Sequence, residues 1–229
     1  MAVRDTSLAK ARGLGYAPRE NLPLLEPPTR LREVREVVDR ILVLEVLTAA
    51  AEGESCNDAR DALEERGLLH ACSASERAYL QMTATESEAP AEWFELNEGQ
   101  WALGWAVSVI RDLDFTRCAG AALSIFLPDE LTGLQAREHL RARCRLRPAA
   151  AIYEARDLAY CLYDCVERAR LGGPPIPERG FDHVIIQRHR ALAWLTYAGD
   201  WDDVVPYASH WPPQQGRKPL RSPRGKAGE

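Results

Sequence analysis

Apolar residues recur at helical spacing along most of the chain, and this feature constrains the fold more than any other. After residue 29, Val34, Val38, Ile41 and Leu42 follow one another at steps of three and four residues, which is the spacing of one helix face. No run of alternating apolar and polar residues bounded by turns is present, so strands are not expected. The pattern predicts an all-α fold, a compact single-domain bundle of about seven to nine helices with little or no β-sheet.

Turn-forming residues divide this pattern into separate helices. The helix that contains Val34 is expected to end near Gly53, and Gly67 is placed to cap the next one. The run Gly172-Gly173-Pro174-Pro175 ends a helix that opens at Pro148. After a short helix near the start of the chain, the expected helices span residues 29–53, 57–66, one opened by a capping box at 73–76, 90–110, a pair broken at Pro128 within 119–143, 148–171 and 182–198. Residues 83–88 are expected to form a surface loop.

A chain of 229 residues fits one large domain with appendages. Residues 1–28 are expected to form a short helix and a docked proline-rich arm, and residues 29–211 the helical domain. The tail, residues 212–229, carries five basic residues and one acidic residue, and its composition predicts disorder. It is either a solvated terminus or an electrostatic arm that weakly binds nucleic acid or an acidic partner. The net charge of −5 on the whole chain argues against a dedicated nucleic-acid binder.

Export and membrane signals are not visible in the sequence. Residues 1–10 are polar and do not resemble a signal peptide. The longest apolar run, residues 41–51, contains Glu45 and is too short to cross a bilayer. The six cysteines are expected to be reduced, because a chain of this size needs no disulfide framework. These features predict a cytoplasmic protein that does not enter membranes.

The densest cluster of charge lies between residues 137 and 147, where a single glutamate opposes five arginines. Guanidinium groups bind phosphate and carboxylate in bidentate fashion, so the cluster is a candidate anion-binding or partner-binding surface. The alternative is that it bonds acidic side chains of neighbouring helices, since the chain has 34 acidic residues. The five residues are Arg137, Arg141, Arg143, Arg145 and Arg147.

Two glutamates fall on apolar helix faces. Glu45 shares helical spacing with Ile41 and Ala49, and Glu98 lies one turn before Trp101. A buried carboxylate must find a partner or take up a proton, which makes both residues candidate buried acids or bases. The simpler interpretation is that each forms an ion pair with one of the many arginines.

Motifs for catalysis, metals and cofactors are weak. No Walker loop, nucleophile elbow or dinucleotide-binding glycine pattern is present, so no catalytic residue and no cofactor is assigned. Cys161 and Cys165 share a helix face without a nearby pair of histidines, and no metal site is expected. A dyad of Cys165 with His189 has no support from spacing.

Several landmarks occur together in a fixed order. They are Gly13 followed by Leu22-Pro23, a long apolar helix after Arg32, Glu98 with Trp101 and Trp105, the segments LRPAAAIYEARDLAY and RARLGG, and RHRALAWL followed by DWDDV. In this order they resemble the bacterial domain-of-unknown-function family 4272 (DUF4272) over about residues 13–204. The resemblance implies a compact all-helical domain and no particular activity.

The matches to this family concentrate near the C-terminal end of the resemblance. Cys161, Asp164 and Gln187 depart from the family's pattern, which weakens the case for a catalytic pocket in this chain. The matching residues are Asp157, Leu158, Tyr160, Ala169 and Arg170, and then Arg188, His189, Ala191, Leu192, Trp194, Trp201 and Asp202.

Two functions are consistent with these features. The first is a non-catalytic helical module that binds another protein of complementary charge, for example in a toxin-neutralising (immunity) or adaptor role. The alternative is an enzyme or a small-anion-binding protein with a polar pocket between the last two long helices, in which His189 would titrate. The residues expected to line that pocket are Asp157, Tyr160, Arg170, Arg188 and His189.

Overall fold

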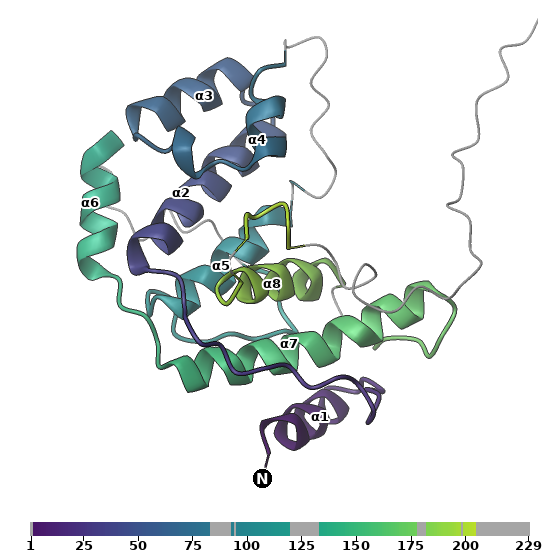
Figure 1. The fold of residues 1–229 in the computed structure, drawn as a ribbon. Helices are drawn as coiled ribbons and strands as arrows, with labels where there is room; N and C mark the ends of the chain where they lie inside the picture. The colour runs from purple at the N-terminus through teal and green to yellow at the C-terminus, as the bar shows by residue number, and fades with distance from the viewer. Residues whose placement is uncertain are drawn as a thin grey trace, which may run out of the picture.

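The computed structural model describes residues 2–82, 93, 95–119, 133–177, 182–197 and 199–204, and all regular structure within them is helical (Figure 1). The prediction of an all-α fold is confirmed for this part of the chain. Its helices are α1 (Val3–Gly13), α2 (Val34–Ala51), α3 (Cys56–Glu65), the 3₁₀ helix η1 (Leu69–Ala71), α4 (Ala74–Tyr79), α5 (Leu96–Ala106), α6 (Gly133–Arg143), α7 (Ala149–Arg170) and α8 (Asp182–Trp194).

Helix α2 lies at the centre of the hydrophobic core. Its residues 41–44 are all fully buried, as expected for a helix that is apolar on nearly every side. It packs against α3, α5 and α6, while α5 packs on α8 and α8 on α7. Helix α1 covers the side of α7 that faces away from α8 (Figure 1). The core therefore runs through a stack of helices in the order α2, α5, α8, α7, with α1 on the outside.

The segment after α1 runs along α7 as an extended arm (Figure 1). Leu22 is buried in a small apolar cluster with Leu8 of α1 and Tyr160 of α7. The Tyr153 hydroxyl of α7 donates a hydrogen bond of 2.7 Å to the backbone oxygen of Leu25. The arm is therefore docked by both apolar and polar contacts.

The helix boundaries follow the predicted start and stop signals closely at several places. The capping box at α4 is present, since the Ser73 hydroxyl accepts from the Glu76 amide at 3.4 Å and the Glu76 carboxylate accepts from the Ser73 amide at 2.7 Å. Gly67, beyond α3, has a φ of 63°, the left-handed conformation that glycine adopts at little cost. Helix α7 covers residues 149–170, within one residue of the predicted ends.

Three helices are shorter than their patterns predict. Helix α2 spans Val34–Ala51 rather than residues 29–53. Helix α5 ends at Ala106 rather than near residue 110, because Ser108 adopts a left-handed φ of 64°. The amides of Val109 and Ile110 both donate to the backbone oxygen of Gly104, at 2.9 and 3.1 Å, and this closes the turn. Helix α8 ends at Trp194 rather than at residue 198.

Some predictions lie outside the described residues. These are the loop at 83–88, the part of the broken pair that includes Pro128, and the basic tail at 212–229. Among the helices that the structure does describe, none combines the length and the apolar character needed to cross a membrane.

Candidate functional site

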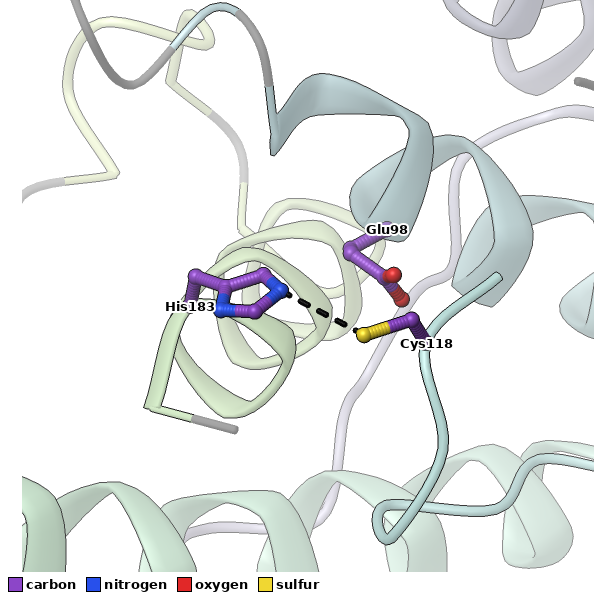
Figure 2. Close-up of side chains that lie close together, drawn as sticks. All are labelled: Glu98, Cys118 and His183. Atoms are coloured by element: carbon purple, nitrogen blue, oxygen red, sulfur yellow. Dashed lines mark hydrogen bonds between the residues drawn. The ribbon is translucent and has the colours of Figure 1, made fainter. Parts of the chain in front are cut away.

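Glu98 forms a sealed ion pair with Arg188. Both side chains are at most 2% exposed, and the Arg188 guanidinium donates to Glu98 Oε2 through Nε at 3.0 Å and Nη2 at 2.6 Å. The Ala119 amide donates to Glu98 Oε1 at 2.6 Å. Glu98 also lies beside Cys118 and His183 (Figure 2). Its carboxylate therefore has the arginine partner that sequence favoured, and Arg188 points toward α5.

Asp157 is paired with a residue of α1. Arg4 Nη2 lies 2.6 Å from Asp157 Oδ1, and Arg4 Nη1 donates to the backbone oxygen of Leu22 at 2.7 Å. The same guanidinium lies 5.6 Å from the centre of the Tyr160 ring. Asp157 thus fixes α1 and the arm onto α7, and it accepts no proton from His189 in the described contacts.

His189 lies between aromatic rings. Its imidazole stacks on Tyr163 with ring centres 4.5 Å apart and planes 8° apart, and it lies 6.2 Å from Tyr160. Burial, together with the nearby charge of Arg156, lowers the pKa of His189 to about 3. The imidazole is therefore neutral at physiological pH, which does not suit the titrating role expected from sequence.

The five residues expected to line one pocket are divided among separate contacts. Arg170 pairs with Asp182 at 2.9 Å and with Glu167 at 3.5 Å, whereas Arg188 pairs with Glu98 and Asp157 with Arg4. The physical reason is that Asp157 and Arg188 are buried and must be paired, and their partners lie on α1 and α5. Arg170 is half exposed and pairs near the surface. Of the five, the structure brings Tyr160 next to His189 and places the three charged groups in different ion pairs.

Most of the arginine cluster is also used internally. Arg137 Nη2 and Arg141 Nη2 each lie 2.8 Å from the carboxylate of Asp39 on α2. Arg147 donates to the backbone oxygens of Trp105 and Ile110, at 2.7 and 3.0 Å, and closes the loop after α5. These contacts fit the alternative in which the cluster bonds neighbouring helices.

The other two arginines of the cluster make local contacts. Arg145 Nη1 donates to the backbone oxygen of Cys144 at 2.6 Å, and Arg143 Nη1 lies 3.5 Å from the ring nitrogen of His139.

Glu45 is half-buried and also has an arginine partner. Arg66 Nη1 lies 3.6 Å from Glu45 Oε2. Burial raises the pKa of Glu45, and the charge of Arg66 opposes that rise. The contact is an ion pair at the edge of the core rather than an isolated acid.

A concave surface lies along the start of α2, and we name it the α2 groove. It consists of two cavities, of about 210 and 300 Å³, that share Arg32 and Glu36. The first is otherwise lined by residues 29–31 and 195–197, and the second by Asp39, Arg40, residues 70–72, Arg77, Trp194 and Asp200.

Two arginines in the α2 groove are held rigidly. Arg32 Nε donates to the backbone oxygen of Trp194 at 2.9 Å, and its guanidinium lies 4.0 Å from the centre of that indole. Arg40 pairs with Glu76 at 2.7 Å and lies 4.9 Å from the centre of the Trp201 ring. Cation–π contacts and ion pairs thus fix both guanidinium groups without filling the groove.

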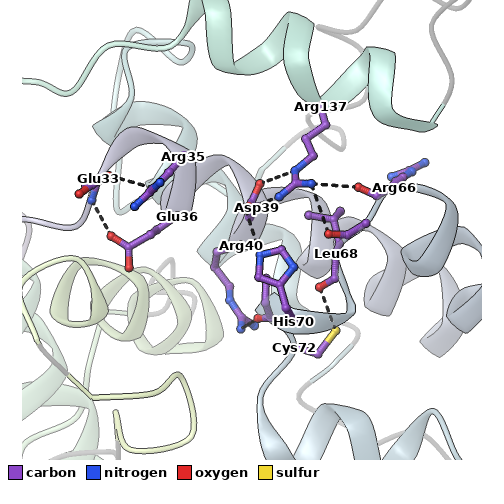
Figure 3. Close-up of polar contacts among 12 residues, drawn as sticks. Glu33, Arg35, Glu36, Asp39, Arg40, Arg66, Leu68, His70, Cys72 and Arg137 are labelled. Atoms are coloured by element: carbon purple, nitrogen blue, oxygen red, sulfur yellow. Dashed lines mark hydrogen bonds and ion pairs between the residues drawn. The ribbon is translucent and has the colours of Figure 1, made fainter.

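Asp39 lines the second cavity of the α2 groove, and Figure 3 shows its carboxylate beside Arg137 and His70. It accepts bonds from Arg137 and Arg141, and His70 Nε2 lies 3.7 Å from its Oδ2. His70 is 64% exposed, so it contacts both solvent and the carboxylate.

Sequence reasoning missed Asp39 and Arg40. Both are charged residues embedded in the buried part of an apolar helix, between Val38 and Ile41. Their position within an apolar run could have identified them, because a buried charge requires partners from other helices.

Comparison with known families gives one match. The family model described as "Domain of unknown function (DUF4272)" matches residues 4–204. No curated protein and no solved structure matches the chain.

Proposed function

Since that match covers most of the chain, the protein belongs to the DUF4272 family, and we propose that it is a non-catalytic helical module that binds another protein. The observation that carries the proposal is the α2 groove, where two adjoining cavities form one concave surface with a fixed set of arginines and aromatic rings. The partner segment lies along both cavities.

The rim of the first cavity carries the residue types that dominate binding energy in interfaces. Tyr197 is 47% exposed and the Arg30 side chain is 79% exposed, while Leu31 and Leu195 supply an apolar wall. Tyrosine, tryptophan and arginine are enriched among the residues whose truncation costs the most affinity. A partner that covers Tyr197 buries its ring without first breaking a buried contact.

The second cavity favours a partner of mixed character. Arg32 and Arg40 are already paired with Glu36 and Glu76. The positive and negative charges of these pairs offset each other, so a charged group of the partner is neither strongly attracted nor strongly repelled there. Arg30, by contrast, makes only a long ion pair of 3.6 Å with Glu33. We infer that the partner presents an apolar side chain to the first cavity and a carboxylate to Arg30.

A toxin-neutralising (immunity) or adaptor role in the cytoplasm of a bacterium is the concrete form of this proposal. The cysteines Cys56, Cys72, Cys118, Cys144, Cys161 and Cys165 are all free thiols, and five of them are buried. Free thiols in this number support a reducing compartment.

The alternative, an enzyme or anion-binding protein with a pocket between α7 and α8, has less support. Its charged residues are taken up by Arg4, Glu98 and Asp182 in separate pairs. Weak binding of nucleic acid by the basic tail stays a further alternative, and it would show as a steep dependence of affinity on salt.

Crosslinking followed by calorimetry tests the proposal. A photo-crosslinking amino acid at position 197 of the full chain, expressed in the native host, is expected to trap one specific protein. The purified partner should then bind the wild-type chain, and the double variant Arg30→Glu, Tyr197→Ala should weaken binding roughly 30-fold or more, as for two interface anchors. Isothermal titration calorimetry measures the change.

The matched control is Arg60→Glu, which makes the same charge change on α3 outside both cavities. It should bind the partner as tightly as the wild-type chain. A partner that binds the double variant equally well would contradict the groove, and the absence of any specific crosslink would contradict the binding function.

A further inference from the structure

Three side chains with different donor atoms meet at one point near α5 and α8. Glu98 comes from α5, Cys118 from the loop that follows it, and His183 from the first turn of α8 (Figure 2). One donor atom of each, a carboxylate oxygen, a thiol sulfur and an imidazole nitrogen, lies within 4.8 Å of the other two. Glu98 is buried, His183 is half-buried and Cys118 is exposed, so the point can be reached from solvent.

The spacing of two of these atoms fits tetrahedral coordination. Cys118 Sγ lies 3.5 Å from His183 Nε2. A tetrahedral zinc ion with Zn–S of about 2.3 Å and Zn–N of about 2.0–2.1 Å holds such atoms roughly 3.6 Å apart. The sulfur and the nitrogen therefore already lie at the separation that shared coordination requires.

Glu98 retains the capacity to bind a cation despite its ion pair. A carboxylate offers about four lone-pair positions. Both bonds from Arg188 go to Oε2, and the Ala119 amide takes one position on Oε1. Among the contacts of the described residues, one position on Oε1 stays available, and Arg188 fixes the orientation of the carboxylate.

The surrounding groups support the ligand side chains. The other ring nitrogen of His183, Nδ1, lies 3.9 Å from Asp182 Oδ1, and Asp182 is held by Arg170 at 2.9 Å. At 3.9 Å the Asp182 contact is electrostatic rather than a hydrogen bond, and Asp182 Oδ1 accepts from the His183 backbone amide at 2.9 Å. Hydrogen bonds to a ligating carboxylate, such as those to Glu98, are usual outer contacts of protein metal sites.

We propose that Glu98, Cys118 and His183 bind a zinc ion. Thiolate, imidazole and carboxylate are together the ligand types that zinc accepts. Three protein ligands leave the fourth tetrahedral position to water or to a ligand that enters from solvent. Glu98 lies in the first turn of α5, whereas Arg147 contacts the last turn of this helix. None of the three proposed ligands lines the α2 groove.

Cobalt substitution tests the site in the full chain. The reduced protein, freed of metal by a chelator, is titrated with Co²⁺, and one ion per chain is expected. A thiolate-to-cobalt charge-transfer band in the near ultraviolet and strong visible bands of tetrahedral Co²⁺ should appear. Zn²⁺ should displace the cobalt.

Two variants assign the ligands. The Cys118 side chain is exposed, so the Cys118→Ser variant should fold normally, and circular dichroism checks its fold. The variant should nevertheless lack the charge-transfer band. His183→Asn should lower the affinity at least about 100-fold, since loss of an outer partner alone costs 10–100-fold. His139→Asn, on α6, is the matched control and should bind as the wild type does. Failure of the wild-type chain to bind Co²⁺, or an unchanged band in Cys118→Ser, would overturn the proposal.

Discussion

At the scale of single residues, arginine determines how this chain buries charge. Arg4, Arg40 and Arg188 are almost fully buried, and each bonds a carboxylate and one or more backbone oxygens. The planar guanidinium has five donors and can satisfy both kinds of acceptor at once. Each of these arginines therefore joins segments that are far apart in the sequence, and loss of one partner leaves a buried charge.

The pair of Arg4 and Asp157 allows a direct test of this cost. Asp157→Leu should lower the free energy of unfolding by about 3–5 kcal/mol, because Arg4 then stays buried without its carboxylate. The double variant Arg4→Met, Asp157→Leu should recover most of the loss, since it removes both charges. Urea unfolding of the wild type, the two single variants Arg4→Met and Asp157→Leu, and the double variant gives the coupling energy. A double variant as unstable as Asp157→Leu would show that packing, rather than the unpaired charge, sets the cost.

At the scale of elements, the contact between α7 and α8 contains a neutral imidazole. His189 of α8 stacks on Tyr163 of α7, and burial lowers its pKa to about 3. The pKa of histidine in an unfolded chain is about 6.5. Between these two values the unfolded chain binds more protons than the folded one, so the stability falls as pH decreases through this range.

Replacing this imidazole should flatten the acid response. His189→Phe keeps an aromatic ring in the stack and removes the proton, so its stability should decrease less between pH 7 and 4.5. Between pH 7 and 4.5 the wild type should lose on the order of 2 kcal/mol more unfolding free energy than His189→Phe. Unfolding by urea at a series of pH values measures it. His70→Asn, at an exposed histidine, should retain the wild-type slope, and equal slopes for His189→Phe and wild type would refute the assignment.

At the scale of the whole molecule, the sequence predicts the helices better than their partners. The ends of α7 and the cap of α4 follow from local signals, namely Pro148, the glycine run after Leu171, and Ser73 with its capping partner. The early end of α5 was missed, because the left-handed Ser108 has no local signature. The meeting of Cys118 with His183 was missed too, because 65 residues separate them and no spacing motif applies.

The short helix and docked arm expected over residues 1–28 pack on α7. In the structure, α1 and the arm supply Arg4 to Asp157, Arg19 to Asp164, and Leu8 and Leu22 to the apolar surface of α7. Without them, α7 would expose an apolar face and two carboxylates would lose arginine partners. Residues 1–28 therefore form part of the packed core and cover the outer face of α7.

A chain that begins at residue 29 should accordingly lose cooperative thermal unfolding and bind a dye specific for exposed apolar surface, because the outer face of α7 is uncovered. A chain that ends at residue 211 is the control and should melt like the full protein, since the composition of residues 212–229 predicts disorder. Scanning calorimetry of the two truncated chains and the full one decides the matter. An unchanged melting temperature for residues 29–229 would mean that α7 is stable without α1. It would also mean that the buried pair of Arg4 and Asp157 does not contribute to the stability of the bundle.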